Sequence, residues 1–369
     1  MRLFLLSPLS LRSSSFRPRA FPESGFDTID PTVLIEEKTL PGYLAEQYYP
    51  ARIGEVFNSR YQILTKLGFG SASTVWLCRD LKCYRVLKVH VRSRRPPQEI
   101  EVLKHLRSLP GDEHPGGSHV RLPLDFFEVI RPHGVHPCLL YAPAGVDIRD
   151  FMSCLENDAL PEELLRPTIR YVLLALDYLL RGNIIHTDEV SNPSPRKQLP
   201  DRTIYATRGM PVSTGQPVLS DLGEARIADS GNQAGLVMPS VYRAPEVMLG
   251  MDQMAWTLFE KGHLFKTRNL DNESDHAIRY AEMIALLGPA RTEFLKRSEI
   301  SLKFWDENGN WRSLAEIPTL TLEERESRLE GDTKTLFLEF LRKTLQWRPE
   351  DRPTVEKLLA DKWVRGNDY

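Results

Sequence analysis

The residues best placed for chemistry in this chain are a glycine-rich stretch and a lysine that follows it. The stretch reads LGFGSASTV over residues 67–75, and the lysine lies in the apolar run VLKV over residues 86–89. Glycines allow backbone N–H groups to approach phosphate oxygens, and a lysine supplies a positive charge beside them. The pattern predicts a nucleotide site formed by Leu67, Gly68, Gly70, Ser73, Val75 and Lys88. An ordinary hairpin turn is the alternative for the glycines alone.

A helix that should carry a partner for the lysine is predicted over residues 98–109, where apolar residues recur at helical spacing. One class of enzymes that transfer phosphoryl groups holds such a lysine with a glutamate from a helix. Glu99 opens this helix, and the competing Glu101 is rotated about 200° away by two helical steps. The sequence therefore predicts a Lys88–Glu99 pair, with a solvated helix face as the alternative for both glutamates.

Two aspartates further along the chain are candidates for catalysis and metal binding. Asp188 ends the motif His-Thr-Asp after a long predicted helix, and a carboxylate there can accept the proton of a substrate hydroxyl. Asp221 follows an apolar run and precedes a Leu-Gly pair, which suits a Mg²⁺ ligand at the end of a strand. A simple turn is the alternative for each motif.

The elements that must position these residues change character along the chain. Alternating and apolar runs predict strands over residues 61–67, 74–80, 84–91, 120–130 and 138–141. Helical spacing follows over residues 161–180, 335–345 and 354–363. A small sheet followed by helices indicates an α+β chain with two lobes.

The flanking segments differ in composition from these lobes. Residues 1–40 form a basic leader with no acid before Glu23, which fits either a mitochondrial transit peptide or a disordered leader. Residues 41–60 are an aromatic-rich extension that we expect to pack on the following domain. Residues 189–217 are rich in Pro, Ser and Arg, as is typical of an insert.

The overall composition narrows the class of protein. The chain has 369 residues, of which 41% are hydrophobic and 27% charged, as expected for a globular protein with a substantial core. A net charge of −2 gives no indication of direct nucleic-acid or acidic-membrane binding. No run approaches the roughly 18 apolar residues of a membrane span. The four cysteines lack metal-site spacing, and we expect them to be reduced thiols.

Across residues 61–363 the chain resembles the eukaryotic protein kinases, and within them the SR-protein kinases, especially the short fungal members. The resemblance rests on IGEVFNSRY before the glycine-rich stretch, STVWLCRD at its exit, HTD in place of HRD, YRAPE over residues 242–246 and an insert before Asp221. It implies a two-lobe protein-kinase fold with a β-rich N-lobe over residues 61–141 and a helical C-lobe over residues 142–365.

The resemblance also implies roles for individual residues. Lys88 would contact ATP phosphates, Glu99 would hold Lys88, Asp188 would be the catalytic base and Asp221 would bind Mg²⁺. Tyr141 would lie in the hinge beside adenine, and Glu246 would pair with Arg352. The resemblance also implies Arg/Ser-rich splicing factors as substrates and a monomeric state. It implies a location in cytoplasm and nucleus, whereas the basic leader favours the mitochondrion as the alternative.

Two compact departures from the family pattern affect the expected activity. The family has asparagine five residues after the catalytic aspartate, where this chain has Pro193; Asn192 is one residue early and is the candidate second metal ligand. After Glu246, about a dozen residues that the family has around a buried helix are absent, and Asp252 is the candidate replacement for the aspartate of that helix.

Three hypotheses account for these departures. In the first, the coding sequence of a working kinase was assembled incompletely. In the second, the chain is a pseudokinase that binds nucleotide or partners without efficient transfer. In the third, it is an active variant that uses Asn192 or Glu189 to bind metal. As written, the chain is expected to bind ATP weakly and to show negligible phosphorylation of Arg/Ser peptides, because the second metal ligand is out of register. A small-molecule phosphotransferase of kinase-like fold is the remaining alternative, and the Ala-Pro-Glu segment with Arg352 argues against it.

Overall fold

A computed structural model of the chain shows two compact units, one of residues 1–148 with 179–229 and one of residues 149–178 with 230–369. The structure describes residues 2–5, 18–21, 29–30, 32–80, 83–92, 97–109, 114–131, 134–182, 184–185, 197–198, 203–204, 207, 215–222, 225–227, 264–265 and 273–366. The expected C-lobe over residues 142–365 therefore differs from the structural division, because residues 179–229 group with the sheet.

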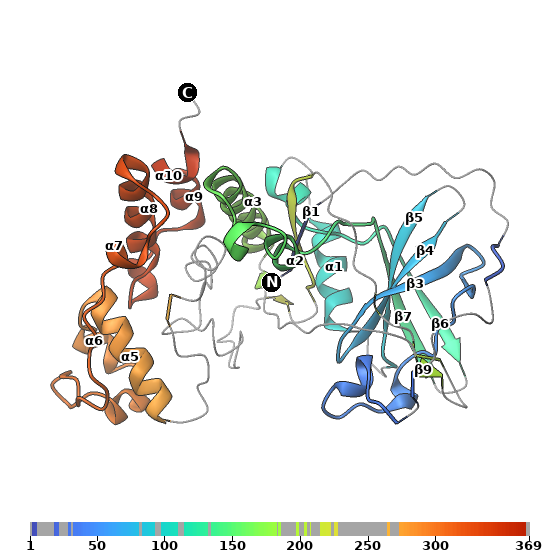
Figure 1. Ribbon diagram of the computed structural model, residues 1–369, viewed down its shortest axis with the longest axis horizontal. Helices are drawn as coiled ribbons and strands as arrows, with labels where there is room; N and C mark the ends of the chain where they lie inside the picture. The colour runs from blue at the N-terminus through green and yellow to red at the C-terminus, as the bar shows by residue number, and fades with distance from the viewer. Residues whose placement is uncertain are drawn as a thin grey trace. The chain divides into compact units, whose positions relative to one another are not determined.

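The first unit is built on a six-stranded antiparallel sheet with the strand order β2-β3-β4-β5-β7-β6 (Figure 1). Its strands are β2 (Val56–Phe57), β3 (Tyr61–Phe69), β4 (Ser73–Arg79), β5 (Tyr84–His90), β6 (Asp125–Arg131) and β7 (Gly134–Tyr141), and the helix α1 (Gln98–Ser108) follows β5. The strand predicted over residues 120–130 starts later, at Asp125, since the 3₁₀ helix η3 (Pro115–His119) precedes it.

The two faces of this sheet have different tasks, because side chains alternate along a strand. Trp76, Leu87 and Leu140 are cross-strand neighbours on the face that we call the core face, and the aromatic-rich extension packs there through Tyr49 and Phe57. The expected packing of residues 41–60 on the sheet is therefore observed.

The opposite face carries the lysine. Val75, Lys88 and Leu139 are cross-strand neighbours, and Tyr141, paired with Val86, lies on the same side. We call this side the lysine face. The register of the sheet thus gathers three of the predicted nucleotide-binding residues, Val75, Lys88 and Tyr141, on one face.

Part of the predicted leader belongs to this unit. The strand β1 (Arg2–Leu5) pairs antiparallel with β11 (Pro217–Ser220). Farther along lie two 3₁₀ helices, η1 (Glu36–Thr39) and η2 (Ala45–Gln47), and Glu36 and Glu37 are buried. The expectation of a disordered leader over residues 1–40 is therefore wrong for Arg2–Leu5 and Glu36–Thr39, because both segments have partners far along the chain.

Short strands attach the region after α3 (Glu162–Arg181) to the sheet unit. The strand β8 (Ile184–Ile185) pairs with β12 (Arg226–Ile227), and β12 lies beside α1. Within the predicted insert, β9 (Lys197–Gln198) pairs with β10 (Thr203–Ile204).

The second unit is helical. Besides the first part of α3 it contains α5 (Glu273–Leu287), α6 (Thr292–Leu295), α7 (Leu322–Arg325), α8 (Gly331–Thr344), α9 (Val355–Leu359) and α10 (Lys362–Arg365), with the short α2 (Ile148–Met152) where the units join. Trp363 is fully buried, and its ring centroid lies 5.0 Å from those of Phe337 and Phe340. The single helix predicted over residues 354–363 is two helices, because the first ends at Leu359 and Asp361 caps the second by accepting the N–H of Trp363 at 2.9 Å. None of the described helices is long and apolar enough to cross a bilayer.

Candidate nucleotide-binding site

Lys88 is the centre of the candidate site. Its ammonium lies 2.7 Å from Oε2 of Glu99 and 2.9 Å from Oδ1 of Asp221, so it joins β5, α1 and the end of β11. Burial disfavours the charge of this lysine, but Glu99 and Asp221 outweigh that effect and raise the pKa of Lys88 above its ordinary value. Lys88 therefore stays protonated, and its one positive charge with two carboxylates leaves a net negative charge that suits a divalent cation.

Glu99 is fixed by three groups. The ammonium of Lys88 contacts Oε2 of Glu99, and Nε2 of His90 lies 3.2 Å from the same oxygen. The hydroxyl of Tyr141 donates to Oε1 at 3.3 Å. Burial acts to protonate this carboxyl, but Lys88 and His90 overcome it and lower the pKa of Glu99. Glu101, the competing glutamate of the sequence analysis, is exposed on another side of α1. The rotation of successive residues around α1 therefore places Glu99, and not Glu101, beside Lys88.

Asp221 lies at the end of a buried strand. All four residues of β11 are buried, and Asp221 directly follows them with a φ of 66°, in the left-handed region that non-glycine residues seldom adopt. Its side chain is 26% exposed, more than that of Lys88 at 13%. This carboxylate can therefore accept both the lysine and an incoming cation.

The glycine loop, residues 68–73, consists of the end of β3, the turn at residues 70–72 and the start of β4. It is closed by the N–H of Gly70, which donates to the carbonyl of Ser73 at 2.8 Å. A Cβ built on Gly68 or Gly70 would meet no described heavy atom within 4 Å, and neither residue has a positive φ. The protein's own described packing therefore does not require glycine at these positions. The open space fits a nucleotide whose phosphates approach the backbone, with Leu67 and Val75 partly exposed beside it.

Tyr141, the last residue of β7, is almost completely buried between two charged groups. Its hydroxyl faces Glu99, and the guanidinium carbon of Arg121 lies 4.9 Å from its ring centroid. Burial raises the pKa of the Tyr141 hydroxyl and lowers the pKa of Arg121 to about 10. Arg121 also donates to the carbonyl of Ala142 at 2.7 Å, so the chain leaving β7 is held in place. The position of Tyr141 beside adenine stays a prediction.

Several predicted residues lie outside the described part of the chain. They are Asp188 and Asn192 of the catalytic segment, and Glu246, the predicted partner of Arg352. Arg352 itself donates from Nε to the carbonyl of Gln346 at 3.1 Å. Within the described residues no cluster of three or more His, Cys, Asp or Glu side chains could hold a metal ion.

Two further residues of the site were not anticipated. His90 lies two residues after Lys88, and the period of a strand places both on the lysine face, a signal that the sequence contained. Arg121 enters from the segment before β6, and no spacing relates it to Tyr141. Its position could be found only from the fold.

Comparison with solved structures identifies the architecture. A crystal structure of a kinase domain superposes with a TM-score of 0.64 over 86% of this chain and 99% of the other, at 19% sequence identity. The sheet unit and the helical unit therefore form the two-lobe protein-kinase fold. No family model matches the sequence.

Sequence similarity to protein kinases of known class shows the family of this chain. A serine/threonine protein kinase of Aspergillus fumigatus is 41% identical over 97% of this chain and 99% of its own length. The chain belongs to the serine/threonine protein kinases. It is also similar to the serine/threonine-protein kinase SRPK of Physarum polycephalum, 27% identical over 89% of this chain and 91% of the relative, and to human SRSF protein kinase 3, 32% identical over 42% of this chain and 28% of that protein.

Proposed function

We propose that this protein kinase transfers the γ-phosphate of ATP to serine residues of Arg/Ser-rich proteins. The observation that supports nucleotide use is the position of Lys88, held between Glu99 and Asp221 on the face beside the open glycine loop. The similarity to SR-protein kinases supports the substrate class.

The residues of the chain have separate tasks in this proposal. Lys88 would meet phosphate oxygens, and Glu99 keeps its ammonium in place. Asp221 would hold Mg²⁺, with Asn192 as the predicted second ligand, and Asp188 would accept the proton of the substrate serine. ATP supplies the phosphoryl group, and Mg²⁺ neutralises the charge on its phosphates.

The test is a transfer assay with the full chain, Mg·ATP and an Arg/Ser-repeat peptide, with Asp188→Ala as the matched control. The proposal requires incorporation of phosphate into serine above the control, and less incorporation into a peptide with alanine in place of arginine. Incorporation equal to the Asp188→Ala background would contradict the proposal. If Mg·ATP then still raises the melting temperature, the pseudokinase hypothesis replaces it.

The proposed compartments are cytoplasm and nucleus. A fluorescent fusion of the full chain should distribute between them in fungal cells. Accumulation of the fusion in mitochondria would instead support the transit-peptide hypothesis for the basic leader.

A further inference from the structure

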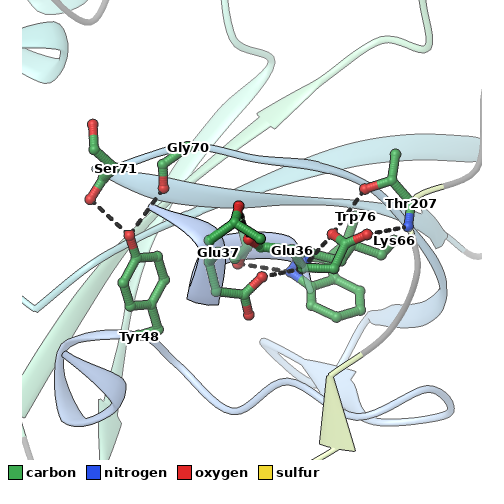
Figure 2. Close-up of polar contacts among 10 residues, drawn as sticks. Glu36, Glu37, Tyr48, Lys66, Gly70, Ser71, Trp76 and Thr207 are labelled. Atoms are coloured by element: carbon green, nitrogen blue, oxygen red, sulfur yellow. Dashed lines mark hydrogen bonds and ion pairs between the residues drawn. The ribbon is translucent and has the colours of Figure 1, made fainter. Parts of the chain in front are cut away.

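The N-terminal segment, residues 32–50, contacts the glycine loop through the side chain of Tyr48 (Figure 2). The hydroxyl of Tyr48 lies 3.1 Å from the carbonyl oxygen of Gly70 and 3.0 Å from that of Ser71. Tyr48 is only 6% exposed, although it reaches a turn in which Ser71 and Ala72 are exposed. A phenol can donate one proton, so the two carbonyls share it.

This contact fixes the direction of two peptide groups. In a planar trans peptide the C=O of one residue and the N–H of the next point in opposite directions. With the carbonyls of Gly70 and Ser71 turned toward Tyr48, the N–H groups of Ser71 and Ala72 point away from it. No acceptor for either N–H lies among the described residues.

The segment that carries Tyr48 is anchored on the core face. Lys66, a cross-strand neighbour of Trp76, is fully buried and forms ion pairs with Glu36 at 2.9 Å and with Glu37 (Figure 2). Thr207 donates to Glu36 from its N–H at 2.9 Å and from its hydroxyl at 3.0 Å. Glu36 therefore links the sheet to a residue of the insert.

A second anchor lies beside Tyr48 itself. The N–H of Arg92, just after β5, donates to the carbonyl of Gln47 at 2.8 Å. The rings of Tyr43 and Tyr48 also pack with centroids 5.1 Å apart. The segment that carries Tyr48 is thus attached to the sheet at two points, at Lys66 on β3 and just after β5.

The hydroxyl of Tyr48 can act as a hydrogen-bond donor to the loop carbonyls only while it is protonated. Burial and the nearby Glu37 raise its pKa to about 12, so the hydroxyl keeps its proton at all physiological pH values.

We propose that Tyr48 is a positioning residue for nucleotide phosphates. Its hydroxyl holds the Gly70 and Ser71 carbonyls on the core-face side of the loop, so that the N–H groups of Ser71 and Ala72 face the side of Lys88 and bind phosphate oxygens. This inference rests on the proposed use of ATP.

The test compares Tyr48→Phe with Tyr49→Phe in the full chain by calorimetric titration. Tyr49 is the adjacent residue, equally buried, and its hydroxyl donates to Glu55 at 2.6 Å rather than to the loop. Mg·ATP and adenosine are the two probes, since adenosine lacks the phosphates. We expect Tyr48→Phe to weaken Mg·ATP binding about fivefold, as for the loss of one hydrogen bond, and to leave adenosine binding unchanged. Tyr49→Phe should change neither.

Equal weakening for both probes, or no weakening for Mg·ATP, would overturn the positioning role. Amide hydrogen exchange without ligand separates this outcome from a failure of the proposed function. Tyr48→Phe should speed exchange at Gly70 and at Val91, whose N–H donates to the carbonyl of Ala72, but not at Ile63. If the Tyr48→Phe variant exchanges at the wild-type rate, the hydroxyl does not hold the loop and the positioning role is refuted. If the variant exchanges faster but the wild-type protein binds no Mg·ATP, the contact is real and only its role in phosphate binding is refuted.

Discussion

The hydroxyl of Tyr141 donates to the carboxylate oxygen of Glu99 that Lys88 does not use. One carboxylate thereby connects the end of β7, the middle of β5 and the start of α1. Because Glu99 is buried, each of its two oxygens needs a partner, and the tyrosine meets part of that need.

Removing this hydroxyl should weaken the fold without removing the ion pair. We expect Tyr141→Phe to lower the free energy of unfolding by about 1 kcal/mol, the usual contribution of one hydrogen bond. Tyr84→Phe, on the partly exposed start of β5, is the control and should change it by less than about 0.5 kcal/mol. Thermal melting of both variants checks this, and equal melting temperatures would contradict it.

Stability should depend on pH through Glu99. Its pKa is lowered in the folded protein, so its contribution is complete above its unfolded pKa, near 4.5, and is lost as the pH falls through the folded pKa. Lys88 has a raised pKa, and its contribution persists up to about pH 10.5 before declining. Between these limits the pair should give a flat profile.

The measurement is melting temperature against pH from 3 to 8 for wild type, Glu99→Gln and Glu101→Gln. Glu101→Gln should follow the wild type, whereas Glu99→Gln should start lower at neutral pH and lose less stability below pH 5. Parallel curves for all three proteins would show that the buried pair does not control acid sensitivity.

The buried cluster at Lys66 should be sensitive to loss of its cation. Lys66→Met leaves Glu36 and Glu37 without their positive partner, which should cost about 3–5 kcal/mol. Lys362→Met, at an exposed position of α10, is the control. Adding Glu36→Gln and Glu37→Gln to Lys66→Met should recover part of the loss, and a further decline in the triple variant would contradict the electrostatic explanation.

The two departures from the family pattern can be tested in the transcript. The alignments to the Aspergillus and Physarum kinases extend over 393 and 395 residues, more than the 369 of this chain, so positions of the relatives have no counterpart here. We expect sequencing across codons 186–221 and 246–262 to reveal in-frame segments that restore an asparagine five residues after Asp188 and an aspartate in the following helix. A transcript that matches the chain as written would support the pseudokinase hypothesis.

The sheet and its lysine could be predicted because their signals are local. Alternation along β5 determines which side Lys88 occupies, and helical phase favours Glu99 over Glu101. The register of β3, β4 and β5 follows from strands joined in order, whereas the pairing of β5 with β7, which places Tyr141 on the lysine face, skips β6 and comes only from the fold.

The Lys66 cluster could not be predicted in the same way. Glu36 and Glu37 lie in a segment without periodicity, and their partner is 29 to 30 residues away with Thr207 far beyond it. A buried lysine between two carboxylates carries no pattern in sequence, since only the fold brings the three charges together. The break before α10 does have a local signal, the N-cap residue Asp361, but helical spacing that continues across it predicts a single helix.

The alternation of β5 also limits how this protein can change over evolutionary time. A deletion of Arg85, earlier in β5, would turn the Lys88 ammonium into the apolar interior and Leu87 outward, and the sheet would lose its core together with its ligand face. A lineage that abandons phosphoryl transfer can therefore replace the lysine by substitution, but it cannot shift the strand. The scaffold of the site should outlast its chemistry.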